Sequence, residues 1–290
     1  MRAADRSGHR LFRWALGPQW RPAPRSAVAE YVAGRRILIT GASAGIGRAC
    51  ALLLADLGAP VALLARREQQ LTAVADEIAD AGGVAEVVVC DLSDPASIAS
   101  AVQVINADPA EIIVNAAGLS IRRSVAETVD RFDTVTRTMA CNYLGPVQLA
   151  TGLLPAMRAR GRGHLIEIST VSVDLPTPAW SAYAASKAAF DCWLRAVGPE
   201  VADDGISVSS LHFPLVHNDS SARTYPSWVP GLSPSDAASV VTAAILRRPR
   251  ELSVWWARAA AHGWRCSRPL ADRLAGRAHR GTFRRLGRTP

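Results

Sequence analysis

Short apolar runs recur along the chain, and helix-length segments separate them. The runs occupy residues 37–39, 61–65, 84–89, 111–114, 164–168 and 206–211. Runs of this length are typical of strands that are buried on both faces, and such strands belong to parallel sheets with helical crossovers. The pattern therefore predicts an α/β protein with a mainly parallel sheet and helices on both faces.

A glycine pattern follows the first apolar run and precedes an amphipathic segment. It reads Thr-Gly-Ala-Ser-Ala-Gly-Ile-Gly over residues 40–47, with the spacing G-x-x-x-G-x-G. A buried strand, a glycine turn and a helix form the first unit of a dinucleotide-binding fold, in which backbone amides and the helix N-terminus face a pyrophosphate. We therefore expect a single Rossmann-type, doubly wound domain. The candidate cofactor-binding residues here are Gly41, Ser43, Ala44, Gly45, Ile46 and Gly47.

Tyr183 and Lys187 are the most informative pair of residues. Lys187 is the only lysine among the 33 Lys and Arg residues, and it lies four positions after a tyrosine, so both side chains project from one face of a helix. An ammonium near a phenol favours the phenolate and lowers the tyrosine pKa, which suits a proton donor. The plainer interpretation is a surface lysine on a helix.

Together these motifs resemble the short-chain dehydrogenase/reductase family, from about Arg36 to about Arg250. Further matches follow in the family's order and are Asp91 with Leu92, the stretch Asn115, Ala116, Ala117 and Gly118, then Asn142, then Pro214 and Val216. The resemblance implies that Asp91 and Leu92 bind adenine, that residues 115–118 and 214–216 contact the nicotinamide half of the cofactor, and that Asn142 supports a proton relay. Tyr183 would donate the proton, and Lys187 would hold the nicotinamide ribose.

Two departures from the family pattern concern the catalytic centre. Thr170 stands thirteen residues before Tyr183, where the family has a serine that polarises the carbonyl oxygen. A threonine hydroxyl can donate the same hydrogen bond, although Ser169 and Ser172 are alternatives. Leu215 replaces the glycine that usually follows Pro214, and Asn218 stands where a threonine is common.

The end of the second apolar run indicates the preferred cofactor. An acidic residue there would accept bonds from the adenine ribose and repel a 2′-phosphate, whereas this chain has Ala65 followed by Arg66 and Arg67. We therefore expect NADPH rather than NADH, with Arg66 on the phosphate. The alternative is that the two arginines merely open a solvated helix. Ala44 gives no support to either choice.

Charge is concentrated in the flanks of the chain. Residues 1–36 hold eight arginines against two acidic residues, and residues 247–290 hold twelve against two, so the stretch between them is acidic although the net charge is +8. The flanks also carry five of the eight tryptophans, which are Trp14, Trp20, Trp255, Trp256 and Trp264. This combination suits peripheral contact with an anionic membrane, and solvated tails are the alternative. Nucleic acid is not an expected partner, because the flanks lack a recognition motif.

Length and composition fit one domain with attached ends. We expect a basic N-terminal extension over residues 1–35, a Rossmann-fold domain over 36–256 and an arginine-rich C-terminal tail over 257–290. Five cysteines show no paired spacing for zinc, so no metal is expected, and we interpret them as reduced core residues of a cytoplasmic protein. No apolar segment is long enough to span a bilayer, which leaves peripheral contact with the inner membrane face.

The segments after residue 211 bear on the substrate. Residues 212–216 and 228–234, followed by the predicted helix 235–246, resemble more weakly the bacterial fatty acyl-CoA and fatty aldehyde reductases. A lid with Leu215, Val216, Tyr225, Trp228 and Val229 suits a lipophilic carbonyl. We therefore expect an NADPH-dependent oxidoreductase, as a homo-oligomer, that reduces a ketone, aldehyde or acyl thioester. A non-catalytic NADP-binding sensor or scaffold is the alternative.

Overall fold

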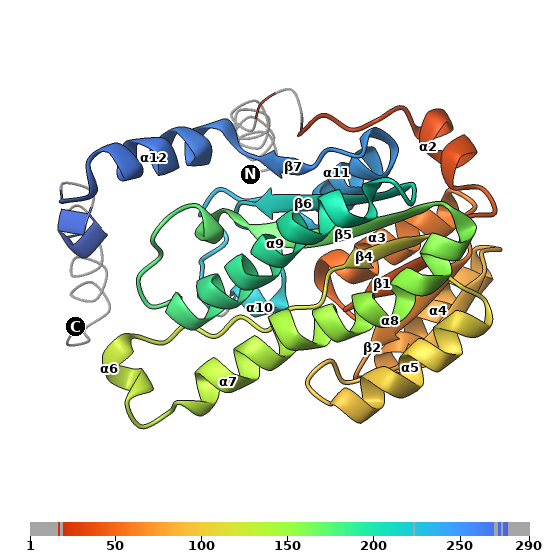
Figure 1. Ribbon diagram of the computed structural model, residues 1–290, viewed down its shortest axis with the longest axis horizontal. Coiled ribbons are helices and arrows are strands. Elements are labelled where there is room, and N and C mark those ends of the chain that lie inside the picture. Colours follow the sequence, from red (N-terminus) through yellow and green to blue (C-terminus); the bar gives the residue numbers. More distant parts are fainter. Residues whose placement is uncertain (1–16, 18–19, 223, 270–271, 274, 278–290) are drawn as a thin grey trace.

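The computed structural model describes residues 17, 20–222, 224–269, 272–273 and 275–277 (Figure 1). Its centre is a seven-stranded sheet in which every neighbouring pair is parallel and the order is β3-β2-β1-β4-β5-β6-β7. The strands are β1 (Ile37–Thr40), β2 (Val61–Ala65), β3 (Ala85–Val89), β4 (Ile112–Asn115), β5 (Gly163–Thr170), β6 (Ile206–Phe213) and β7 (Glu251–Ser253).

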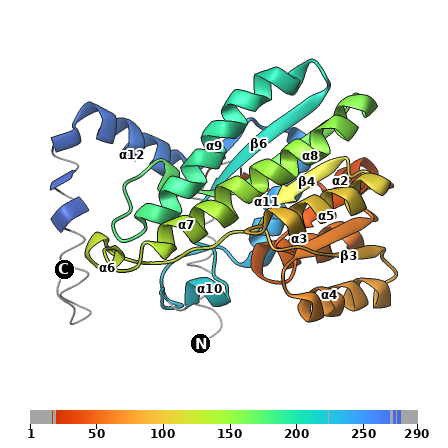
Figure 2. The same ribbon diagram turned by 60° about the horizontal axis from the view of Figure 1, so that its bottom comes forward.

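Helices cover both faces of this sheet (Figures 1 and 2). One face packs against α2 (Arg25–Val32), α3 (Gly45–Asp56), α4 (Glu68–Asp80) and α11 (Pro234–Arg247). The other face packs against α5 (Pro95–Ala107), α8 (Gly145–Arg160) and α9 (Ser181–Ala202). Neighbouring residues of β1 divide between the two cores, since Ile37 and Ile39 face the first set of helices and Leu38 faces the second. The prediction of a doubly wound, parallel α/β fold is confirmed.

The remaining helices surround the ends of the strands. They are α6 (Val125–Thr128), α7 (Asp133–Met139), the π-helix η2 (Ala140–Leu144), the 3-10 helix η3 (Val171–Val173), α10 (Asp219–Ala222) and α12 (Trp255–Cys266). The chain leaves β1 toward β2 on one side and returns to β4 on the other, so the strand order reverses at β1. Ligands of open α/β sheets bind in the crevice beyond the carboxyl ends at such a point.

Strands β3 and β7 differ from what the apolar runs predict. The run 84–89 is not fully buried, because β3 lies at the edge of the sheet and leaves Val84 and Val89 exposed. The short strand β7, which pairs with β6, was not predicted at all. Its three residues are too few to form a recognisable apolar run.

Parts of both flanks pack into the core of the domain, beyond its expected boundaries. Trp20 and Val28 lie before residue 36 and are buried in the core. Helix α12 begins at residue 255 and crosses the boundary expected after residue 256, and its Ala257 is fully buried. Trp14 and residues 278–290 lie outside the described residues. Among the described residues, no helix combines the length and apolar character needed to cross a membrane.

The cysteines are only partly core residues. All five are free, and Cys50 and Cys90 are buried as expected. Cys192 and Cys266 are exposed, because each lies on a face of its helix that no other element covers.

Candidate active site

The glycine turn between β1 and α3 lies against the loop that follows β4. Gly41 has a φ of +68°, and a Cβ added to it would lie 2.8 Å from the Ala117 Cα atom. A Cβ on Gly47 would lie 2.4 Å from the Gly41 carbonyl oxygen, so neither position tolerates a side chain. Ser43 and the other turn residues Ala44, Gly45 and Ile46 are half-buried, and no side chain caps the N-terminus of α3. The first-turn amides of α3 therefore suit an anion.

The two arginines at the end of β2 contact different residues. The Arg67 Nη2 atom donates a hydrogen bond of 3.0 Å to Ser43 Oγ. Arg66 lies 3.7 Å from the Asp91 carboxylate, which also accepts from Ser93. The Ser93 hydrogen bonds and then the Arg66 charge hold the pKa of Asp91 below its usual value. Sequence reasoning singled out Arg66, whereas Arg67 is the residue in contact with the turn.

Leu92 supports the same region from behind. It is buried, and its carbonyl oxygen would lie 2.0 Å from a Cβ added to Gly145, the first residue of α8. This close approach holds the segment after β3 against the start of α8.

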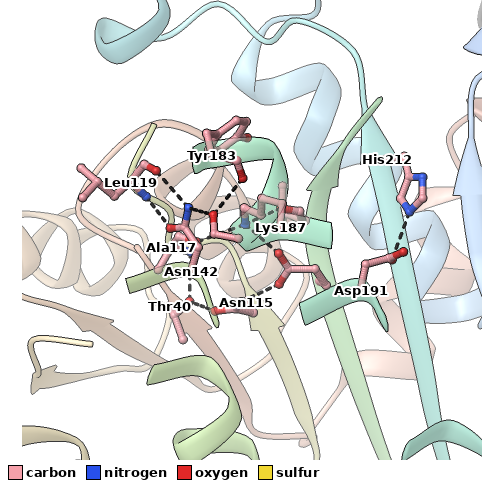
Figure 3. Close-up of polar contacts among 12 residues, drawn as sticks. Thr40, Asn115, Ala117, Leu119, Asn142, Tyr183, Lys187, Asp191 and His212 are labelled. Carbon is pink, nitrogen blue, oxygen red and sulfur yellow. Dashed lines mark hydrogen bonds and ion pairs between the residues drawn. The ribbon is translucent and has the colours of Figure 1, made fainter. Parts of the chain in front are cut away.

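A buried polar chain joins β1, β4 and β5 beneath the site (Figure 3). Thr40 Oγ1 donates to Asn115 Oδ1 at 2.7 Å and accepts from the Ala117 amide at 3.0 Å. The Asn115 amide donates to the Glu167 carboxylate. Asn115 therefore points into the sheet, while Ala116 and Ala117 are half-buried and Gly118 is exposed. Sequence reasoning did not single out Thr40, which it read only as the start of the glycine pattern, or Glu167, which lies within a run that it treated as apolar.

Asn142 lies on the π-helix η2 and is fully buried. Its Nδ2 atom donates to the Leu119 carbonyl and to Ser186 Oγ, both at 2.9 Å, and its Oδ1 atom accepts from the Leu119 amide at 2.7 Å. Ser186 in turn donates to the Tyr183 carbonyl oxygen at 2.8 Å. Asn142 thus ties the loop after β4 to the helical turn that carries Tyr183. A π-helix inserts one extra residue into a helix, which re-aims a side chain, and such insertions occur often at functional sites.

Lys187 is 3% exposed, and its ammonium lies among three acceptors (Figure 3). The Nζ atom lies 2.6 Å from Glu167 Oε1, 2.9 Å from the Ile168 carbonyl oxygen and 3.5 Å from the Ala117 carbonyl oxygen. A Cβ added to Gly118 would lie 3.5 Å from the Lys187 Cε atom, so the loop after β4 covers the side chain. The surface-lysine interpretation is therefore wrong.

Thr170 lies at the end of β5, close to Tyr183 on α9, and its hydroxyl acts on the pKa of the phenol. Thr170 Oγ1 donates to Ser172 Oγ at 3.3 Å and accepts from the Ser172 amide at 3.2 Å, whereas Ser169 Oγ is buried without a hydrogen-bond partner among the described residues. Of the three candidate hydroxyls, Thr170 is the one that acts on the Tyr183 pKa.

The pKa of Tyr183 departs from the expectation based on Lys187 alone. Burial raises this pKa above its ordinary value, and the Lys187 charge and the Thr170 hydroxyl oppose the rise. The Glu167 carboxylate adds to the rise. The expected lowering of the tyrosine pKa therefore does not hold for this structure, chiefly because the phenol is buried.

The segment after β6 lies beside the glycine turn. Pro214 and Val216 are both buried, and Val216 forms a parallel bridge with Leu232. A Cβ added to Gly45 would lie 3.5 Å from the Asn218 side-chain nitrogen. Leu215 stands at the family's glycine position. Its carbonyl oxygen accepts a hydrogen bond from the Leu232 amide at 2.9 Å.

Trp180, Tyr183 and Tyr225 form an aromatic cluster. The Trp180 ring meets the Tyr183 ring edge-on with centroids 6.0 Å apart, and it stacks on Tyr225 at 6.4 Å. Sequence reasoning named Tyr225 but missed Trp180, which gives no periodic signal in the loop before α9. Trp228, also expected in this lid, is 80% exposed. The arrangement provides apolar surface next to a hydroxyl pair.

Comparison with known proteins finds relatives among the short chain dehydrogenases. The family model for short chain dehydrogenases matches residues 35–226. The chain is 42% identical over 227 residues to a fatty acyl-CoA reductase of Acinetobacter baylyi, a match that covers 77% of each protein. It is 40% identical over 220 residues to the fatty acyl-CoA reductase Rv0547c of Mycobacterium tuberculosis, covering 74% of this chain and 75% of that one.

A solved structure agrees with the fold and with the kind of cofactor expected. It is that of a candidate NAD(P)-dependent gluconate 5-dehydrogenase from Beutenbergia cavernae with bound NADP. The two proteins superpose with a TM-score of 0.71 at 29% identity, over 76% of this chain and 94% of the other. The likeness covers the sheet and its helices, so the glycine turn and the Tyr183 region occupy a shared framework.

Proposed function

The chain belongs to the short-chain dehydrogenase/reductase family of oxidoreductases, and we propose that it is an NADPH-dependent reductase of lipophilic carbonyl compounds. The observation that carries the proposal is the buried Lys187 ammonium one helical turn from Tyr183, with the Thr170 hydroxyl close to the phenol. These groups lie at the carboxyl ends of β4 and β5, beside the glycine turn. A sensor without turnover would not need this assembly, and the reductase names of the relatives support an enzyme.

The proposed chemistry uses each of these side chains once. Bound NADPH would supply a hydride to the carbonyl carbon. Thr170 would donate a hydrogen bond to the carbonyl oxygen and polarise it, and Tyr183 would give that oxygen its proton, which converts a ketone or an aldehyde into an alcohol. An acyl thioester would instead give a hemithioacetal, which releases the thiol and leaves an aldehyde. Lys187 would hold the sugar nearest the reaction and stabilise Tyr183 after the proton leaves. Asn142 would keep the loop and helix in register and support reprotonation from solvent.

The residues present fit a pyrophosphate and an adenosine with an extra phosphate. The uncapped N-terminus of α3 and the glycines at positions 41 and 47 let backbone amides approach an anion. Arg66 and Arg67 follow the end of β2, whose last residue is Ala65 rather than an acidic residue that would oppose a 2′-phosphate. Asp91 with Leu92 would bound the adenine pocket, and Pro214 with Val216 would bound the nicotinamide end. These features support NADPH over NADH.

The substrate proposal rests on the aromatic lid. Trp180 meets the Tyr183 ring edge-on and stacks on Tyr225, which places apolar ring surface beside Tyr183 and favours an aliphatic chain over a sugar. The relatives named as fatty acyl-CoA reductases support a ketone, aldehyde or acyl thioester on such a chain.

We propose in addition that the chain works as a homo-oligomer in the cytoplasm and touches the inner membrane through its basic flanks. Helix α12 offers one part of this surface, because Trp255 is 57% exposed and Arg265 lies in its last turn. Tryptophan and arginine together suit the interface of an anionic bilayer. In this proposal, residues 1–35 and 257–290 are the basic flanks and residues 36–256 are the Rossmann-fold domain. These boundaries follow the distribution of charge and not the packing of the helices.

Oxidation of NADPH across a panel of carbonyls tests the proposed function. Wild type should turn over long-chain ketones, aldehydes or acyl thioesters, and Tyr183→Phe should lower the rate by roughly a hundred- to ten-thousandfold while cofactor affinity is kept. Tyr143→Phe is the matched control, since it removes a tyrosine hydroxyl outside this assembly. Wild-type protein that binds NADPH but reduces no member of the panel would refute the reductase and favour a sensor.

A further inference from the structure

Glu167 is a fully buried carboxylate that the proposed chemistry does not yet use. It lies on β5 with no exposed surface, and both of its oxygens are engaged. Oε1 accepts from Lys187 Nζ at 2.6 Å, and Oε2 accepts from the Asn115 amide. A buried charge of this kind is costly unless it is paired and hydrogen-bonded, and here it is both.

The contacts of Lys187 show what the carboxylate does for the ammonium. An ammonium has three protons, and the Lys187 Nζ atom faces three acceptors, of which Glu167 is the nearest and the only charged one. Burial alone would lower the pKa of Lys187, but Glu167 and then Tyr183 raise it above its ordinary value. Glu167 therefore keeps this amine charged and fixes its direction.

The charged and titratable groups around the pair are few. Tyr225 faces Tyr183 from the segment after α10, and Cys141 faces Lys187 from the π-helix. Asp191, one turn beyond Lys187 on α9, adds its charge at Glu167. Glu167 is the only carboxylate that acts on both Lys187 and Tyr183. The two opposite charges of the ion pair offset each other at the phenol.

We propose that Glu167 is a positioning residue that acts through Lys187: it fixes the ammonium and offsets its charge, so that Tyr183 stays a phenol, the form that donates a proton, up to a more alkaline pH. This inference rests on the proposed function, because it assigns Tyr183 as the donor. Lys187 without its partner would favour the phenolate more strongly, and a phenolate has no proton to give.

The test compares the pH dependence of reduction in four proteins. Replacing Glu167 by Gln removes the charge and should move the alkaline limb of kcat/KM for carbonyl reduction to lower pH by about one unit. Glu167→Asp keeps the charge and should keep the wild-type limb. Glu111→Gln is the matched control, because Glu111 is a buried carboxylate paired with arginines, at the opposite ends of the strands. An unchanged limb in Glu167→Gln, or an equal shift in Glu111→Gln, would overturn the proposal.

A titration without turnover separates this inference from the proposed function. The ultraviolet absorbance of tyrosinate is followed against pH in wild type and in Tyr183→Phe, and the difference gives the titration of Tyr183. In wild type it should lie above the ordinary tyrosine range, and in Glu167→Gln it should lie lower. A wild-type titration at or below the ordinary range would overturn the inference even if Glu167→Gln failed to fold. A wild type that reduces no carbonyl refutes the function, whereas this titration still decides the role of Glu167.

Discussion

The guanidinium of Arg67 donates a hydrogen bond of 3.0 Å to the hydroxyl of Ser43, so the end of β2 is tied to the glycine turn. Arg66, its neighbour, lies instead beside Asp91. The two arginines thus approach the expected adenosine position from two sides, and their contributions can be separated.

Removing either arginine should weaken NADPH binding selectively. A charge-assisted hydrogen bond to a phosphate contributes about 1.5–3 kcal/mol, so Arg66→Ser or Arg67→Ser should raise the Kd for NADPH by roughly ten- to a hundredfold and leave that for NADH nearly unchanged. Fluorescence titration with both cofactors measures this. Arg48→Ser, which removes an arginine that pairs with Glu77, is the control. Equal NADPH affinity in all three variants would remove the support for a 2′-phosphate site.

Thr170 is expected to be the hydroxyl donor. Thr170→Val keeps the shape of the side chain and should lower kcat by roughly a hundredfold with little change in cofactor affinity, because the lost bond strengthens as charge builds on the carbonyl oxygen. Thr170→Ser should restore most of the rate. Steady-state kinetics of these variants beside Ser169→Ala would expose an error, since a larger loss in Ser169→Ala would transfer the role to that residue.

The two carboxylates around His212 should make the free energy of unfolding fall at alkaline pH. Its Nδ1 and Nε2 atoms lie 2.8 Å from Asp174 and 3.1 Å from Asp191. Burial alone would lower the pKa of His212, but the two carboxylates raise it to about 9. A raised histidine pKa stabilises the fold fully below the unfolded value and loses this effect as pH rises through the folded one. The free energy of unfolding should therefore fall by up to about 3 kcal/mol between pH ~6 and pH ~10.

Urea unfolding of two histidine variants checks this prediction. In His212→Gln the alkaline decline should be much smaller than in wild type. His164→Gln is the matched control, because burial lowers the pKa of His164 to about 3 and the ring is neutral across this range. A decline of the same size in His212→Gln would place its origin in other groups.

The basic C-terminal flank should determine binding to anionic vesicles. A chain that ends at Ser267 retains α12 with its buried Ala257 but loses seven arginines. The full chain should sediment with vesicles rich in anionic lipid and release as salt increases, because exposed charges are screened. The shortened chain should bind much less, and neither should bind zwitterionic vesicles. Binding that survives the truncation would exclude this flank as the contact.

The periodicity of the sequence was sufficient for the fold but not for its margins. Strands β1, β2, β4, β5 and β6 were each predicted from an apolar run, which reflects that both of their faces are covered. Strand β7 has three residues and exists only because it pairs with β6. The expected boundary after residue 256 falls inside helix α12. It was placed where the arginine content rises, which the sequence shows, whereas the burial of Ala257 is visible only in the structure.

Within the candidate site, local motifs gave the residues but not their partners. The spacing of Tyr183 and Lys187 is a property of one helix, so it could be read directly. Glu167 is twenty residues from Lys187 and sits in a strand of otherwise apolar character. A buried charge leaves no periodic mark, and only the pairing of β5 with α9 shows that its partner is Lys187. Sequence reasoning predicted the wrong direction for the pKa of Tyr183 because the burial of the phenol, which raises that pKa, cannot be read from the spacing of Tyr183 and Lys187.

The buried position of the only lysine gives the chain a single chemical reporter. An amine-reactive dye can reach the ε-amino group of Lys187 only when the contacts of that group with β5 and the loop after β4 open. A protease that cuts after lysine would likewise divide the chain once, after residue 187, and only in molecules that have opened. The rate of labelling or cleavage would therefore measure local opening at this one position, and a ligand that closes the crevice should slow it.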